Sequence, residues 1–157
     1  MRSSPHGIKS EAFAPTAMGR HGAVVANHPL AAMAGMGVLI DGGNAVDAAV
    51  AIGFALGAAE PQGSGIGGDG IVMMHMQKAA TLEVVNGTGA APQAATAERY
   101  REGIPLTGIL SVSVPGIVDA LLQTHGRHGT LSVARCVEPA IALCEEGVPV
   151  SHYQARI

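Results

Sequence analysis

The chain has 157 residues, a length that suits one domain or a piece of a larger one. Its formal net charge is −3 and no basic run is present, which argues against a nucleic acid or an anionic membrane surface as partner. Apolar residues make up 48% but aromatic residues only 3%, and glycine occurs 22 times. The expected core therefore consists of small, closely packed residues.

The first segment, residues 1–21, mixes polar, proline and small residues without a period, which is typical of a flexible arm. It lacks the apolar stretch of a secretory signal peptide, and no run approaches the length of a membrane-spanning helix. We therefore expect a cytoplasmic protein. Ala23–Ala26 reads as a short buried strand.

Two helices are expected next. His28 and Pro29 mark the start of the first, which covers Leu30–Ile40 and ends at two glycines. Asn44 is expected to cap a second helix over residues 45–59, with an acidic residue in its first turn. Because this helix is apolar on nearly every face, it is expected to be buried.

A glycine-rich loop at 60–70 precedes two expected strands, Ile71–Met76 and Thr81–Val85, and a loop at Asn86–Pro92. Further helical segments are expected in three places: Thr96–Gly103, Pro115–Thr124 closed by Gly126, and a stretch after Thr130 that restarts at Pro139 and ends at Glu146.

Several short motifs suggest chemistry that their context does not support. Gly63–Gly68 has the letters of a dinucleotide fingerprint, but a helix precedes it and a strand follows, which is the reverse of the required order. Ser64 lies in a poor match to a serine nucleophile turn, because Gln62 stands where glycine is required. His125 and His128 fall in an expected turn without a third ligand, so we interpret them as a solvated pair and predict no metal site.

The two cysteines, Cys136 and Cys144, have no metal-binding spacing. We expect two buried or half-buried free thiols rather than a disulfide.

Five blocks, in order along the chain, resemble the large subunit of the γ-glutamyltransferase family. No single block is specific for the family, but the occurrence of all five in the family's order is. They are Gly22–Ala31, Asp41–Ala51, Glu60–Gly68, Ser113–Gly116, and the pair Glu138–Ile141 with Glu145–Val150.

This resemblance implies an α+β fold, part of the αββα sandwich of N-terminal nucleophile hydrolases. Residues 22–157 would be the N-terminal portion of the large subunit, an incomplete domain. Family members cut themselves, and the new N-terminal threonine of the small subunit becomes the nucleophile. That threonine would lie downstream, so we expect no catalytic residue here. The implied partners are the small subunit from the same precursor and a small-molecule γ-glutamyl or related amide, without metal or organic cofactor.

One departure from the family concerns substrate binding. The family has an R-E-x-A-P motif after the second strand, and its arginine binds the α-carboxylate of the γ-glutamyl group. Alignment on Ala91 and Pro92 places Thr88 at the arginine and Gly89 at the glutamate, and Asp69 stands where many members have glycine. Thr88 and Gly89 are therefore the candidate substrate-binding residues.

A threonine cannot replace a bidentate guanidinium, so a related amidohydrolase or acylase with another acyl substrate is an alternative. Thr88 also fits a plain turn residue, since Asn86–Gly89 has strong turn chemistry. An alternative of another class is a truncated, non-catalytic remnant or structural subunit, suggested by the abrupt end at Ile157.

Overall fold

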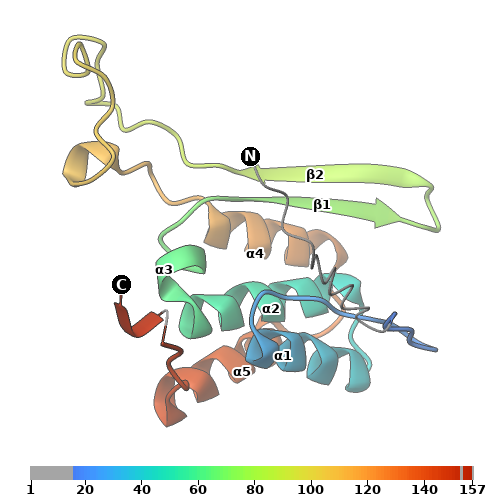
Figure 1. Cartoon of the computed structure of the whole chain (residues 1–157). Helices are drawn as coiled ribbons and strands as arrows, with labels where there is room; N and C mark the ends of the chain where they lie inside the picture. The colour runs from blue at the N-terminus through green and yellow to red at the C-terminus, as the bar shows by residue number, and fades with distance from the viewer. Residues whose placement is uncertain (1–15, 153, 157) are drawn as a thin grey trace, which may run out of the picture.

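The computed structural model describes residues 16–152 and 154–156, in which helices pack against one face of a two-stranded sheet (Figure 1). This arrangement confirms the α+β prediction. No helix among these residues is long and apolar enough to cross a membrane. The elements in chain order are α1 (Pro29–Ile40), α2 (Ala45–Ala59), α3 (Pro61–Ser64), β1 (Gly70–Met76), β2 (Thr81–Gly87), η1 (Ile109–Ser111), α4 (Ile117–His128), α5 (Val133–Glu146) and η2 (Gln154–Arg156).

Helix α2 is the centre of the molecule, with α4 on one side and α1 and α5 on the other (Figure 1). Val50, Ala51 and Ala55 are fully buried, which confirms the expectation of a helix enclosed on most faces. Asn44 caps the helix as predicted: its Oδ1 accepts hydrogen bonds from the backbone N–H groups of Val46 (2.8 Å) and Asp47 (3.1 Å). The small side chains of α2 allow three helices to approach it closely.

The start of α1 also follows the sequence prediction. His28 is the N-cap, and its Nδ1 accepts a hydrogen bond from the backbone N–H of Leu30 at 3.2 Å. Pro29 occupies the first helical position, where its missing N–H has no intrahelical partner to lose.

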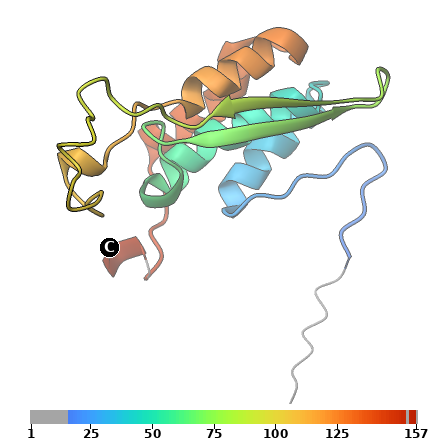
Figure 2. The same cartoon turned by 90° about the horizontal axis from the view of Figure 1, so that it is seen from above.

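Strands β1 and β2 form an antiparallel hairpin that lies across α4 and α2 (Figure 2). Met74 and Val85 are buried on the face that meets the helices. The opposite face is exposed and carries four large apolar side chains, Ile71, Met73, Leu82 and Val84, beside His75 and Asn86. We call these four residues the outer hairpin face.

Two predicted elements are wrong. Ala23–Ala26 is extended but is not a strand, and Val25 is 91% exposed, because no strand of the described chain lies beside it. Residues Thr96–Gly103 form turns rather than a helix. Thr96 Oγ1 does accept from the backbone N–H of Arg99 at 3.4 Å, but few apolar contacts extend that turn into a helix.

The boundaries of the last two helices also differ from the prediction. Helix α4 continues through Gly126 to His128, because Thr124 and His125 on its inner face are buried and hold the final turn. Helix α5 is continuous through Pro139. A proline inside a helix removes one hydrogen bond, but Cys136 and Ala140 are buried on either side of it and fix the helix against α2.

Residues 88–116 leave the hairpin, project to one side and return to α4 (Figure 1). The base of this excursion is fastened by hydrogen bonds from Val114 N to Ala90 O (3.0 Å) and from Gly116 N to Gly68 O (3.2 Å). The glycine-rich loop thus lies beside both ends of the excursion. Of the predicted N-terminal arm, residues 1–15 lie outside the described residues, and 16–21 are exposed without helix or strand.

Candidate functional site

The two predicted substrate-binding residues lie directly after β2. The backbone N–H of Thr88 donates to Asn86 Oδ1 at 2.9 Å, a side-chain-closed turn, and the residue is exposed. The turn chemistry expected from the sequence is therefore present, and it turns Thr88 out of the hairpin. A role of Thr88 in substrate binding remains a prediction.

Asp69 joins the glycine-rich loop to both ends of the excursion. Its Oδ1 accepts a hydrogen bond from the backbone N–H of Gly89 at 2.8 Å. Ser113 Oγ donates to the same carboxylate, at 3.0 Å to Oδ2 and 3.2 Å to Oδ1. The sequence marked Asp69 only as a departure from the family, since contacts across 20 and 44 residues leave no local signal.

Gly89 has no room for a side chain in this arrangement. A Cβ atom there would lie 2.5 Å from Ser113 Oγ and 2.6 Å from Asp69 Oδ1, and would also meet the carbonyl oxygen of Val114. Such distances are far below van der Waals contact. Gly89 therefore lets the backbone of the loop reach the Asp69 carboxylate directly.

A hollow of about 350 Å³ opens beside Gly89 and Ser113. Its wall is mostly apolar and includes Ala91, Pro92 and Leu110. Among the described residues that line it there is no lysine or arginine. The side chains that line this hollow are therefore uncharged, while Arg99 lines a neighbouring hollow that shares Tyr100 and Ser113 with it.

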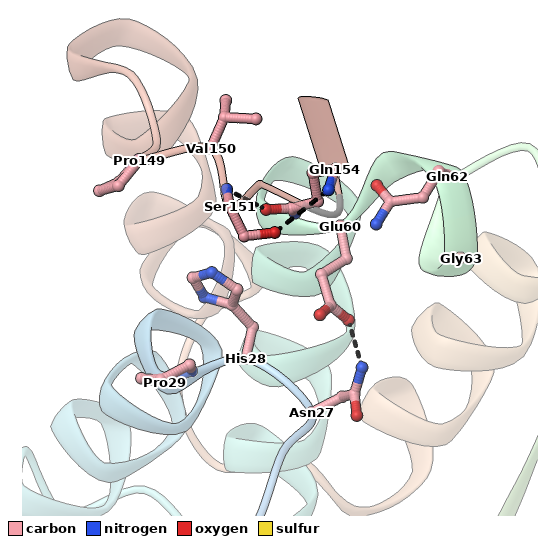
Figure 3. Close-up of a pocket in the computed structure, with 10 residues that line it drawn as sticks. All are labelled: Asn27, His28, Pro29, Glu60, Gln62, Gly63, Pro149, Val150, Ser151 and Gln154. Atoms are coloured by element: carbon pink, nitrogen blue, oxygen red, sulfur yellow. Dashed lines mark hydrogen bonds between the residues drawn. The ribbon is translucent and has the colours of Figure 1, made fainter. Parts of the chain in front are cut away.

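A larger hollow of about 760 Å³ lies where α1 begins and α2 ends (Figure 3). Several of its polar side chains are bonded to one another or to backbone: Asn27 Nδ2 donates to Glu60 Oε2 at 2.8 Å, and His28 caps α1. Thr88 and Gly89 do not line it. We interpret its polar groups as structural contacts between the two helices.

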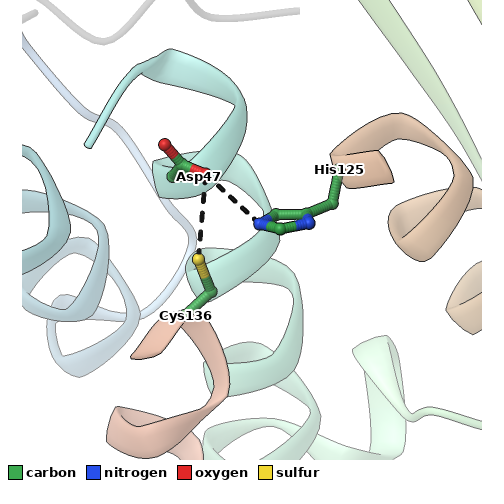
Figure 4. Close-up of side chains that lie close together, drawn as sticks. All are labelled: Asp47, His125 and Cys136. Carbon is green, nitrogen blue, oxygen red and sulfur yellow. Dashed lines mark hydrogen bonds and ion pairs between the residues drawn. The ribbon is translucent and has the colours of Figure 1, made fainter. Parts of the chain in front are cut away.

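A buried cluster of Asp47, His125 and Cys136 is the third candidate (Figure 4). Asp47 and Cys136 are fully buried and His125 is 9% exposed. His125 Nε2 lies 3.3 Å from Asp47 Oδ1, and the Cys136 thiol points at the same oxygen from 4.0 Å. Their ligand atoms lie within 4.8 Å of one another, which by distance alone could surround a metal ion.

The hydrogen bonds of Asp47 favour a structural role. Its carboxylate accepts from Thr130 Oγ1 (2.6 Å), Thr130 N (3.0 Å), Leu131 N (3.3 Å) and Asn44 N (2.8 Å). Burial raises the pKa of the Cys136 thiol, and the nearby charge of Asp47 raises it further, so the protonated thiol is favoured. The carboxylate is already surrounded by donors from the chain, which favours a structural contact at this cluster.

The expectations for the histidines and cysteines were wrong in part. His125 and His128 lie in α4 rather than in a turn, and they are not a solvated pair: His125 meets Asp47, and His128 Nε2 lies 3.0 Å from Glu83 Oε2. Both cysteines are free, but Cys144 is exposed while Cys136 is buried. The spacing of Leu121, Thr124, His125 and His128 on one helical face was the signal that could have placed the histidines.

The environment of the Asp47 carboxyl also makes the free energy of unfolding depend on pH. Burial alone would raise the pKa of this carboxyl, but hydrogen bonds from Thr130, Asn44 and Leu131 lower it below its ordinary value of 3.8. Because the folded-state pKa is depressed, the stabilisation is present above the unfolded pKa and is lost as the pH falls through the folded pKa. We expect the gap in unfolding free energy between wild type and Asp47→Asn to be constant between about pH 5 and 7 and to shrink below about pH 4. Urea titrations at a series of pH values measure it, and a gap that widens on acidification would contradict the assignment.

Comparison with known proteins shows which family the chain resembles. The family model described as Gamma-glutamyltranspeptidase matches residues 31–157. The chain is 38% identical over 147 residues to the glutathione hydrolase proenzyme of Bacillus subtilis (88% of this chain, 25% of that protein). It is 39% identical over 150 residues to the acylase ACY 1 proenzyme of Pseudomonas sp. strain SE83 (87% and 27%).

Among solved structures, the γ-glutamyltranspeptidase of Helicobacter pylori superimposes with a TM-score of 0.84 at 34% identity, over 90% of this chain and 42% of that chain. The described fold is thus part of a larger one, and the chain spans about a quarter of the length of the curated relatives above. With the family model covering most of the sequence and the fold matching in space, the chain belongs to the γ-glutamyltranspeptidase family.

Proposed function

We propose that the complete protein is a self-processing enzyme that cleaves or transfers an acyl group from an amide. Residues 22–157 would form the front part of its large subunit, with the small subunit cut from the same precursor as partner. Two relatives, the glutathione hydrolase of Bacillus subtilis and the acylase ACY 1, are both named as proenzymes, which supports processing of a precursor.

In the proposed reaction a threonine downstream of this chain supplies the nucleophile. Its Oγ bonds to the amide carbonyl carbon, the C–N bond breaks, and the leaving amine takes the proton that the threonine hydroxyl gave to its own α-amine. Water or a second amine then attacks the ester, releasing a carboxylic acid or a new amide and restoring the hydroxyl. No oxidation or reduction occurs.

The outer hairpin face supports the proposed partner. Its four apolar residues are exposed, and the sheet that carries them has two strands among the described residues. An exposed apolar sheet face of this kind is covered by further structure in a stable protein. We propose that the remainder of the same precursor covers it.

The proposed substrate is an acyl amide whose acyl group lacks a carboxylate at the Thr88 position. The observation that carries this is the neutral side chain of Thr88, and the uncharged lining of the hollow beside Gly89, which Thr88 itself does not line, is consistent with it. A γ-glutamyl group carries such a carboxylate, and a buried carboxylate without a cation is costly. A γ-glutamyl substrate remains the alternative.

Thr88→Arg in the complete protein tests this substrate assignment. Two substrates that differ only in the α-carboxylate, γ-glutamyl-4-nitroanilide and 4-aminobutyryl-4-nitroanilide, are compared by their kcat/KM values. A new guanidinium–carboxylate pair is expected to raise the ratio in favour of the γ-glutamyl substrate by about tenfold or more.

Thr88→Gln, which is long but uncharged, is the matched control and should leave this ratio within about threefold of wild type. An unchanged ratio in Thr88→Arg would show that position 88 does not face the acyl group. A complete protein that neither cuts itself nor hydrolyses any acyl nitroanilide would contradict the proposed function itself.

A further inference from the structure

We propose that Asp69 determines the acyl specificity of this site in two ways: its carboxylate positions the Thr88–Gly89 loop, and its negative charge repels an acyl group that carries a carboxylate there. The proposal rests on the proposed function for its substrate part. The positioning part stands on the structure of this chain alone.

Positioning follows from the hydrogen bonds of the two carboxylate oxygens. Oδ1 receives the backbone N–H of Gly89 at 2.8 Å and, at 3.2 Å, the hydroxyl of Ser113. Asp69 directly precedes β1, whose pairing with β2 fixes it relative to the start of the loop. The loop that carries Thr88 is therefore held at Gly89 by the side chain of the residue that directly precedes the opposite strand.

Position 89 has no room for a side chain while the loop keeps this conformation, because the backbone carbonyl of Val114 closes the site together with Ser113 and Asp69. A Cβ atom on Gly89 would already lie 2.6 Å from Asp69 Oδ1. A longer side chain at position 89 would have to displace the carboxylate and open the loop. The presence of Asp69 and the absence of a side chain at Gly89 are thus two parts of one arrangement.

The charge of Asp69 is not neutralised by the described chain. Among the ion pairs of the described residues, none includes Asp69. Its side chain is exposed, and Oδ2 receives only the hydroxyl of Ser113 at 3.0 Å. A second carboxylate brought to the same loop would meet like charge, whereas an uncharged or amine-bearing acyl group would not.

Asp69→Asn separates the two roles. The amide oxygen of asparagine can still accept from the Gly89 N–H, and its NH₂ can donate to Ser113 Oγ, so the loop stays in place while the charge is removed. Asp69→Ala removes both the charge and the acceptor. Asp119→Asn removes an exposed charge in the first turn of α4 that makes no hydrogen bond to the loop, and is the matched control.

The substrate part is tested in the complete, processed protein with the two nitroanilides described above. Asp69→Asn is expected to raise the kcat/KM ratio of γ-glutamyl to 4-aminobutyryl substrate by about tenfold, mainly through a lower KM for the γ-glutamyl compound. Asp119→Asn is expected to leave the ratio unchanged. An unchanged ratio in Asp69→Asn would overturn the charge role.

The positioning part is tested without activity, by hydrogen exchange of the Gly89 amide in the same protein. Asp69→Ala is expected to speed this exchange by about tenfold or more, and Asp69→Asn to keep it near the wild-type rate. Equal rates in wild type and Asp69→Ala would overturn the positioning role. If wild type cleaves neither nitroanilide, the proposed function fails, but the exchange result still decides whether Asp69 holds the loop.

Discussion

Replacement of Asp47 by alanine is expected to lower the free energy of unfolding by about 2–4 kcal/mol, because it leaves several partly buried donors without their acceptor. The carboxylate is fully buried and accepts from the hydroxyl and backbone N–H of Thr130 and from the backbone N–H groups of Asn44 and Leu131. These bonds join the start of α2 to the turn between α4 and α5. Urea unfolding followed by circular dichroism measures the loss.

Two variants calibrate this result. Thr130→Val removes only the hydroxyl donor and should cost about 1 kcal/mol, because the backbone bond to Asp47 remains. Asp119→Asn, on the exposed side of α4, should change the unfolding free energy by less than about 0.5 kcal/mol. A loss below about 1 kcal/mol in Asp47→Ala would mean that water replaces the carboxylate at little cost, contrary to its burial.

Adding one methyl group at Gly87 is expected to destabilise the protein by about 2–3 kcal/mol, since the site is closed by backbone. A Cβ atom there would lie 2.5 Å from Ala120 Cβ, 2.8 Å from Gly116 O and 2.9 Å from Gly70 O. None of these atoms is the movable end of a long side chain. Gly87→Ala must therefore push β2 away from α4.

Gly126→Ala is the matched control and is expected to change stability in the opposite direction. Gly126 lies within α4, and a Cβ atom there would meet nothing within 4 Å. Alanine in an open helical position is expected to stabilise by about 0.5–1 kcal/mol. If thermal unfolding shows the same change for both variants, the close contact between β2 and α4 is not present in solution.

Local sequence signals were sufficient to predict where the central helices begin. The start of α1 could be predicted from His28 and Pro29, and that of α2 from Asn44 with Asp47, because capping depends on residues a few positions apart. The two apolar runs predicted as strands, Ile71–Met76 and Thr81–Val85, were likewise enough to locate β1 and β2. The family resemblance rested on the same segments.

The remaining features depend on neighbours that are distant in sequence. Ala23–Ala26 has strand composition but no partner strand in the described chain, and His125 looked exposed until Asp47 was placed beside it. The Asp69–Gly89 contact and the adjacent hollow require the hairpin and the return of the excursion. The sequence could therefore indicate which residues to examine, but not how their charges are arranged.

The link between Asp47 and Thr130 also sets an order for folding during synthesis. The two residues are 83 positions apart, so Asp47 is made well before the donors that hold its carboxylate in the core. At elongation rates of about 5–20 residues per second, Thr130 is therefore synthesised roughly 4–17 s after Asp47. Until Thr130 emerges from the ribosome, the Asp47 carboxylate has only the donors of its own helix start, and the contacts of α2 with α4 and α5 cannot form.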